Sequence, residues 1–182
     1  METRKESLIV TLVDLEKEMF SLVRSSVEAP CQKDLDAFAL HRDAQLFAWS
    51  VETLESYQAD LLDAKQSGIN LMTIKYARMG GQIPSYSCNP LIPTLVDRFL
   101  FWQIEIKNMF PKVMRQSRTP DDFCTYLGCE LETYSDRTIK LLASDVASFT
   151  KKGKNMTVVT YERLARSSGF SSLMALELHI SL

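Results

Sequence analysis

The chain has 182 residues, of which 46% are hydrophobic and 24% are charged, as in an ordinary globular domain. Its 21 basic and 23 acidic residues leave a net charge of −2, so the protein as a whole has no general attraction for nucleic-acid phosphates or anionic membranes. Charged residues interrupt every apolar run near the N-terminus, so we expect no secretory signal and a cytoplasmic protein with reduced cysteines.

Helical periodicity predicts two helices in the first third of the chain. The first covers residues 6–24, where apolar side chains recur at alternating steps of four and three. The second begins after Asp34 and continues to about Gln66. Its apolar pattern weakens near residues 41–43, where we expect a bend.

Gly68 and Asn70 mark the turn into a short third helix. Glycine adopts the left-handed conformation that ends many helices, and an asparagine side chain accepts hydrogen bonds from the first N–H groups of the next helix. The third helix is expected to stop at Gly80 and Gly81. A linker rich in glycine, proline and serine then covers residues 82–93.

The second half of the chain repeats this pattern. A fourth helix is expected from about residue 94, with Pro111 ending or kinking it. Thr119, followed by Pro120 and two acidic residues, predicts the start of a fifth helix that continues to about Lys152.

Gly153 and Asn155 form the turn into a sixth helix, which Gly169 closes, and a last helix covers residues 171–182. No segment shows sustained alternation with the period of a β-strand. The predicted fold class is therefore all-α, with about seven helices in a single domain over residues 1–182.

The two halves share residues at a fixed spacing of 85 positions. Residues 49–79 align with residues 134–164 without a gap, and seven of the 31 positions are identical. We expect two three-helix repeats, over about residues 6–81 and 94–169, that share one core around a pseudo-twofold axis. The identical pairs are Ser50/Ser135, Thr53/Thr138, Asp60/Asp145, Gly68/Gly153, Asn70/Asn155, Tyr76/Tyr161 and Arg78/Arg163.

Each repeat carries an acid and an arginine at matching distances from its turn. Asp60 lies eight residues before the glycine of the first turn, and Arg78 lies eight residues after its asparagine. At 1.5 Å per residue, both are expected about 12 Å from the turn. Asp145 and Arg163 have the same relation to the second turn. The spacing predicts two structural clamps, Asp60 with Arg78 and Asp145 with Arg163.

A polar stripe also follows the helix before each turn, made of Ser50, Thr53, Tyr57 and Asp60 in the first repeat and of Ser135, Thr138 and Asp145 in the second. Two interpretations are open. The hydroxyl groups bond to carbonyl groups of their own helix, or the two stripes face each other and line a cleft for a partner protein or a small ligand, which is anionic if the arginines reach it. The candidate binding residues are Trp49, Ser50, Thr53, Tyr57, Arg78, Tyr134, Ser135, Arg137, Thr138 and Arg163.

Few residues suggest catalysis. His41 and His179 are the only histidines and no Glu-x-x-His motif is present, so we predict no metal site and no cofactor. Nucleotide-binding and serine-hydrolase motifs are absent as well. Cys31 precedes the start of a predicted helix, where a thiolate is stabilised, and is a weak catalytic candidate. An enzyme or cofactor-handling protein that uses Cys31 and the polar stripe is one alternative to a binding protein.

A transcription regulator is the other alternative. Residues 157–180 resemble a degenerate helix-turn-helix motif, with Ala165 and Gly169 at the spacing of that motif. The second helix of the motif contains Glu177 and no lysine or arginine, so it offers nothing that binds phosphate or guanine. We therefore expect neither nucleic acid nor a membrane as the partner. The sequence leaves open whether the protein forms a homodimer.

Four stretches of the sequence are similar to one known family: LVDLEKEMF, CQKD, WSVETLESYQADLLDAKQSGINLMTIKYARM and TYSDRT. They resemble a bacterial family catalogued only as a domain of unknown function, DUF family number 4125. The similarity covers about residues 8–170. It implies no activity, but it includes Cys31 and Gln32 among the family positions.

Overall fold

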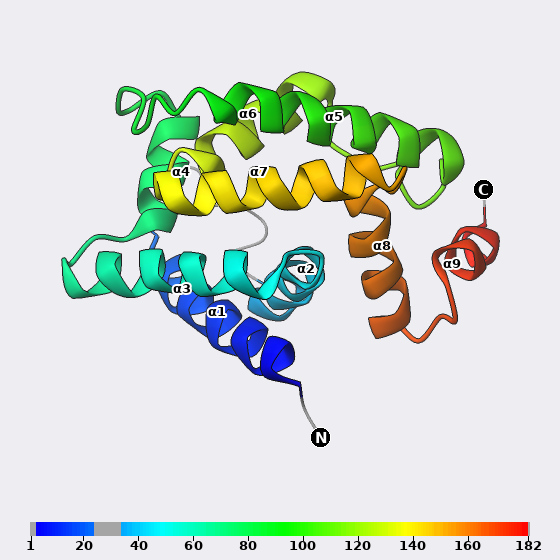
Figure 1. Ribbon diagram of the computed structural model, residues 1–182. Helices are drawn as coiled ribbons and strands as arrows, with labels where there is room; N and C mark the ends of the chain where they lie inside the picture. Colours follow the sequence, from blue (N-terminus) through cyan, green and yellow to red (C-terminus); the bar gives the residue numbers. More distant parts are fainter. Residues whose placement is uncertain (1–2, 24–33, 182) are drawn as a thin grey trace.

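The computed structural model describes residues 3–23 and 34–181. These residues contain nine α-helices and no strand, which confirms the all-α fold class. Figure 1 shows their arrangement. The helices are α1 (Arg4–Ser21), α2 (Leu35–Phe47), α3 (Val51–Gln66), α4 (Leu71–Met79), α5 (Leu91–Met109), α6 (Pro120–Leu131), α7 (Asp136–Lys151), α8 (Met156–Ser167) and α9 (Leu173–His179).

Local capping chemistry starts and ends the helices where the sequence predicts. The side chains of Asn70 and Asn155 accept backbone N–H groups at the starts of α4 and α8, and the hydroxyl of Thr119 does so at the start of α6. Gly68 and Gly153 have positive φ angles of 69° and 60°, a conformation that glycine adopts without steric cost. The two Gly-x-Asn turns are therefore explained by backbone geometry.

The predicted helix count is wrong because both long helices are interrupted. The segments 34–66 and 119–152 each contain two helices, since Ser50 and Ser135 start new ones, α3 and α7. Each serine hydroxyl accepts the N–H of the residue three positions later. The apolar pattern continues through the breaks because Trp49 and Tyr134, just before the serines, are buried.

Two further boundaries differ from expectation. Residues 41–43, where a bend was expected, lie inside α2, and the helix continues through them without a break. α5 begins at Leu91, within the predicted linker, and Pro93 occupies its first turn, where a missing N–H costs no hydrogen bond. The helix ends at Met109, just before Pro111, as expected.

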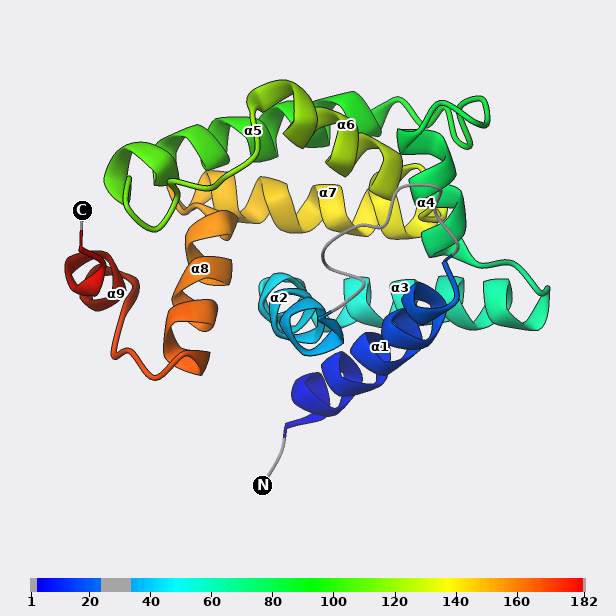
Figure 2. The ribbon, with the colours of Figure 1, turned by 180° about the vertical axis from the view of Figure 1, so that it is seen from behind.

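The helices form two layers, with α1, α2 and α3 in one and α5, α6 and α7 in the other (Figures 1 and 2). The layers meet where α3 packs against α7, while α4 packs on α6 at one end and α8 packs on α2 at the other. Buried apolar side chains of both layers belong to one cluster, which includes Phe20, Leu54, Leu131 and Ile139. α9 lies at the edge against α8. In the described residues, no helix combines the length and the apolarity that crossing a membrane requires.

Reciprocal hydrogen bonds join the two central helices. The carboxylate of Asp145 in α7 accepts the N–H of Ser50 at 2.9 Å and the hydroxyl of Thr53 at 2.7 Å. The carboxylate of Asp60 in α3 accepts the N–H of Ser135 at 3.0 Å. Each acid therefore sits at the N-terminus of the opposite helix, where the helix dipole favours a negative charge.

The predicted Asp–Arg clamps are wrong, because both arginines pair with other acids. Arg78 pairs with Glu132 at 2.9 Å, and Arg163 pairs with Asp43 at 2.8 Å. An acid and an arginine at equal distances from a turn meet only if the helices on either side of the turn, α3 with α4 and α7 with α8, pack along each other. In the structure α4 packs on α1 and α6, and α8 packs on α2 and α5, so each arginine meets an acid from another part of the chain.

Candidate functional site

The polar stripes of α3 and α7 meet, but the structure closes the space between them. The hydroxyls of Ser56 and Thr138 lie 2.8 Å apart across the contact. Thr53 and Thr138 have no exposed surface, and their hydroxyls are already bonded to neighbouring side chains. These residues hold the two layers together, so the cleft expected between the stripes is not present there.

The other predicted binding residues are dispersed. Arg137 is exposed on α7, and Ser135 borders a smaller, open hollow. Cys31 lies outside the described residues. Of the ten candidate binding residues, only Trp49 and Tyr134 line the large cavity of the molecule. The described cysteines Cys88, Cys124 and Cys129 are free thiols, and none of them lines that cavity.

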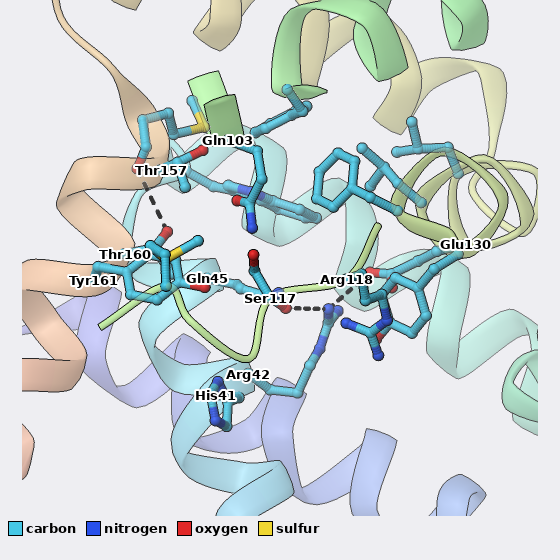
Figure 3. A pocket seen from close by; sticks show the side chains of 18 of the residues that line it. His41, Arg42, Gln45, Gln103, Ser117, Arg118, Glu130, Thr157, Thr160 and Tyr161 are labelled. Carbon is cyan, nitrogen blue, oxygen red and sulfur yellow. Dashed lines mark hydrogen bonds and ion pairs between the residues drawn. The ribbon is translucent and has the colours of Figure 1, made fainter. Parts of the chain in front are cut away.

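The cavity has a volume of about 630 Å³ and lies between α2, α5, α6 and α8, closed on one side by the loop of residues 110–118. This volume is within the range of sites for small molecules. Figure 3 shows side chains from all of these elements directed into it. Its apolar wall includes Trp49, Phe99, Leu127, Leu142 and Met156, and its neutral polar groups include Gln45, Gln103, Ser117 and Thr160.

Glu177 holds the loop that closes the cavity. Its buried carboxylate accepts the N–H of Lys112 at 3.0 Å and the N–H of Val113 at 2.8 Å. The ammonium group of Lys112 also donates to the carbonyl of Ile180. α9, the predicted second helix of the DNA-binding motif, therefore uses its acid to position a wall of the cavity.

A buried ion cluster borders the cavity. We use this name for Glu16, Arg42, Lys75 and Glu130, which come from four different helices, together with Tyr57 and Tyr134. Arg42 lies at the centre, with its Nε 2.6 Å from Glu16 and its Nη1 2.7 Å from Glu130. The ammonium of Lys75 lies 2.6 Å from the other oxygen of Glu130. Arg42 and Glu130 reach the cavity wall (Figure 3).

The two tyrosines complete the cluster. The hydroxyl of Tyr57 donates to Glu16 at 2.6 Å, and the hydroxyl of Tyr134 donates to Glu130 at 2.7 Å. Two carboxylates and two cations balance each other, and all four are almost completely buried, with exposed fractions of 0 to 6%. Removing Arg42 would leave Glu16 without a cation, and removing Glu130 would leave Lys75 without an acid; a buried charge without a partner is strongly unfavourable.

The electrostatics of the cluster keep its protons in place. Burial alone would raise the pKa of Glu130, but the charges of Arg42 and Lys75 outweigh it and hold that pKa well below the ordinary value. Burial alone would lower the pKa of Lys75, but the charge of Glu130 raises it instead. Burial and the neighbouring carboxylates raise the pKa values of Tyr57 and Tyr134. These shifts favour the charged forms of Glu130 and Lys75 and the neutral forms of Tyr57 and Tyr134, which are the forms that the hydrogen bonds of the cluster require.

Two basic side chains lie against the ring of Tyr126, which lines the cavity. The guanidinium of Arg118 stacks on the ring of Tyr126, with its Cζ 4.0 Å from the ring centroid, and Lys75 lies 3.6 Å from the same centroid. Arg118 has no ion-pair partner within residues 3–23 and 34–181. Desolvation, and then the positive charge of Arg118, lower the pKa of His41, which also lines the cavity.

One polar atom in the cavity wall has no partner. The hydroxyl oxygen of Ser117 is buried and makes no hydrogen bond to any described residue. Figure 3 shows the side chains of Ser117 and Gln103 both directed into the cavity. Burying a hydroxyl without a hydrogen-bond partner destabilises the folded state, and a ligand with a polar group would offset this cost by bonding to it.

The ion cluster was not predicted from the sequence, although the position of Glu16 in the amino-acid sequence indicates a buried charge. Glu16 lies four residues after Leu12 and three residues before Met19, in the middle of the stripe that faces the core. A charged residue at such a position needs a partner in the core. The sequence does not indicate which of the other charged residues this partner is, because they lie on other helices.

The chain was compared with known protein families, curated proteins and solved structures. The family model described as "Protein of unknown function (DUF4125)" matches residues 6–178. The chain belongs to this family. A search of the curated proteins and a search of the solved structures each found no match.

Within the described part of the chain, no three histidine, cysteine, aspartate or glutamate side chains come together as ligands for a metal ion.

Proposed function

We propose that the protein binds a small molecule in the cavity between α2, α5, α6 and α8. The volume of about 630 Å³ supports this proposal, as does a lining that combines aromatic walls with a few convergent polar groups. The ion cluster on one side is fully paired, so it provides a rigid wall and takes no part in chemistry. A binding function therefore fits the site better than an enzymatic one.

We also infer that the chain consists of two related halves, with four helices in each rather than the three expected. The packing supports this inference, because α1 contacts α2, α3 and α4 as α5 contacts α6, α7 and α8. The contact of α4 with α6 likewise corresponds to that of α8 with α2. The exchanged caps from Asp60 to Ser135 and from Asp145 to Ser50 follow the same pattern.

The spacing of 85 residues also accounts for the cavity, and this is the observation that carries the proposal. The positions of Lys75, Tyr57 and Arg42 correspond to Thr160, Leu142 and Leu127, which line the cavity. Where Lys75 fills space in one half, the short side chain of Thr160 leaves space in the other. A concave space of this size lined by several helices is the usual form of a small-molecule site, so we propose that a ligand occupies this one.

The experiment compares two threonine variants by native mass spectrometry of freshly purified protein and by binding of an added fluorescent naphthalene probe. Thr160→Phe places a ring in the cavity and is expected to reduce binding at least about tenfold, since filling a pocket removes the apolar contacts that a ligand makes. Thr150→Phe is the matched control, because Thr150 is exposed on α7 and its hydroxyl also bonds to the carbonyl four residues earlier.

The control variant is expected to bind like the unchanged protein, and both variants are expected to keep the helical circular dichroism of the parent. Equal binding by Thr160→Phe and the parent would show that the cavity is not the site. A small molecule that co-purifies with the parent and is lost from Thr160→Phe would support the proposal directly.

A further inference from the structure

We infer that the ligand of this cavity has an apolar, aromatic-sized body and one anionic group, and that Arg118 binds the anionic group. This inference rests on the proposed function and makes it specific. Arg42 and Glu130 in the cavity wall are paired, Arg118 forms no ion pair with any described residue, and the hydroxyl of Ser117 lies next to it in the chain.

The charge balance of the wall favours an anion. Its charged residues are Arg42, Glu130 and Arg118. The first two belong to the ion cluster, whose two carboxylates and two cations cancel. Arg118 is therefore the one unbalanced charge of the described wall, and a negatively charged group is its natural complement.

Arg118 is also able to make the contact. Its side chain is exposed, so solvent or a ligand reaches the guanidinium. Stacking on Tyr126 fixes the plane of the guanidinium but uses none of its N–H donors. A guanidinium with free N–H groups binds a carboxylate, sulfonate or phosphate oxygen through two parallel hydrogen bonds.

A second donor lies next to it in the chain. The hydroxyl of Ser117 is buried in the wall, has no partner among the described residues and faces the cavity. The wall also contains apolar side chains, among them Trp49, Phe99 and Met156. The wall thus pairs a polar patch of two donors with an apolar pocket, which suits a ligand that is charged at one end only.

The test uses two probes with the same anilinonaphthalene body. 8-Anilinonaphthalene-1-sulfonate carries one negative charge, and N-phenyl-1-naphthylamine carries none. Fluorescence titration of the full chain is expected to give at least about tenfold tighter binding for the sulfonate, the size of a charge-assisted hydrogen bond. Arg118→Gln is expected to remove this difference and to leave the affinity for the neutral probe within about twofold.

Arg115→Gln is the matched control. Arg115 is an exposed arginine three residues away that does not line the cavity. The same change in net charge at this position is expected to leave the preference for the sulfonate intact, which separates direct contact from general attraction.

The outcomes distinguish the two proposals. If both probes bind equally well, Thr160→Phe blocks both and Arg118→Gln changes nothing, the cavity is a binding site but the selection of anions is wrong. If Thr160→Phe leaves both affinities unchanged, the proposed function fails as well. If Arg115→Gln and Arg118→Gln weaken the sulfonate equally, the effect is general electrostatics and the role of Arg118 is refuted.

Discussion

Two neighbouring regions of this protein are built from residues 85 positions apart, and their interiors are opposite in character. In the first, Lys75 of α4 and Glu130 of α6 form an ion pair that fills the core. In the second, the residues 85 positions from this pair are Thr160 of α8 and Gln45 of α2, which face a cavity. The same helix packing therefore accommodates a set of paired charges in one place and an empty volume in the other.

The proposed relation between the two halves predicts that a buried ion cluster is kept or lost as a unit. Arg42 and Glu130 each pair with two other ions, so losing either of them leaves a buried charge without a partner. In the second region the positions of Arg42, Lys75 and Glu130 are all neutral, and no charge is stranded. Because Thr160 is much shorter than lysine and Leu127 is smaller than arginine, these positions leave more space than their counterparts do.

The largest effect is expected from breaking the cluster. Glu130→Gln removes the charge that pairs with both Arg42 and Lys75, and is expected to lower the free energy of unfolding by about 3–5 kcal/mol. The measurement is urea unfolding followed by circular dichroism. Glu55→Gln, at an exposed acid paired with Arg4, is the control and should cost less than about 1 kcal/mol. Similar losses in the two variants would mean that the cluster does not stabilise the fold.

The pH dependence of stability sharpens the same point. The pKa of Glu130 is lower in the folded state than the value of about 4.3 for an unfolded chain. Its ionised form therefore stabilises the folded state above that pH, and this contribution is lost as the pH falls below about 4. Unfolding between about pH 6 and pH 3 should show a steeper fall for the parent than for Glu130→Gln, which has no carboxyl group to protonate there. Parallel curves would contradict this role.

An intermediate effect is expected from building the missing ion pair into the cavity. Thr160→Lys alone places an ammonium beside the positive Arg42, so it should destabilise the fold. Adding Gln45→Glu supplies a carboxylate at a position whose present amide lies 2.7 Å from Arg42. The double variant should recover about 1–3 kcal/mol relative to the sum of the single variants, and lose binding of the sulfonate probe because the cavity is filled. Strictly additive losses would indicate that the two positions do not correspond to the ion pair.

The smallest effects are expected where the two halves exchange caps. Asp145→Asn weakens two hydrogen bonds, from the N–H of Ser50 and the hydroxyl of Thr53, whereas Asp60→Asn weakens one, from the N–H of Ser135. Thermal unfolding should show losses of about 1–2 kcal/mol for Asp145→Asn and about 0.5–1 kcal/mol for Asp60→Asn. The reverse order would show that the number of hydrogen bonds at these caps does not determine their strength.

The sequence by itself determined the helices and most of their ends. A cap such as Thr119 or Asn155 bonds to atoms two or three residues away, and a glycine turn such as Gly153 depends on its own φ angle. The breaks at Ser50 and Ser135 follow the same local rule. They were missed because the buried aromatic residues before them continue the apolar pattern.

Only the tertiary structure decided which charges meet and where space is left. Asp60 and Arg78 are equally far from the turn in the sequence, yet they do not contact each other. Asp60 accepts the N–H of Ser135 and Arg78 pairs with Glu132, because α4 packs on α1 and α6. The ion cluster and the cavity likewise draw their residues from helices far apart in the chain. Such contacts depend on how whole helices cross, and a pattern with the period of a single helix contains no information on that crossing.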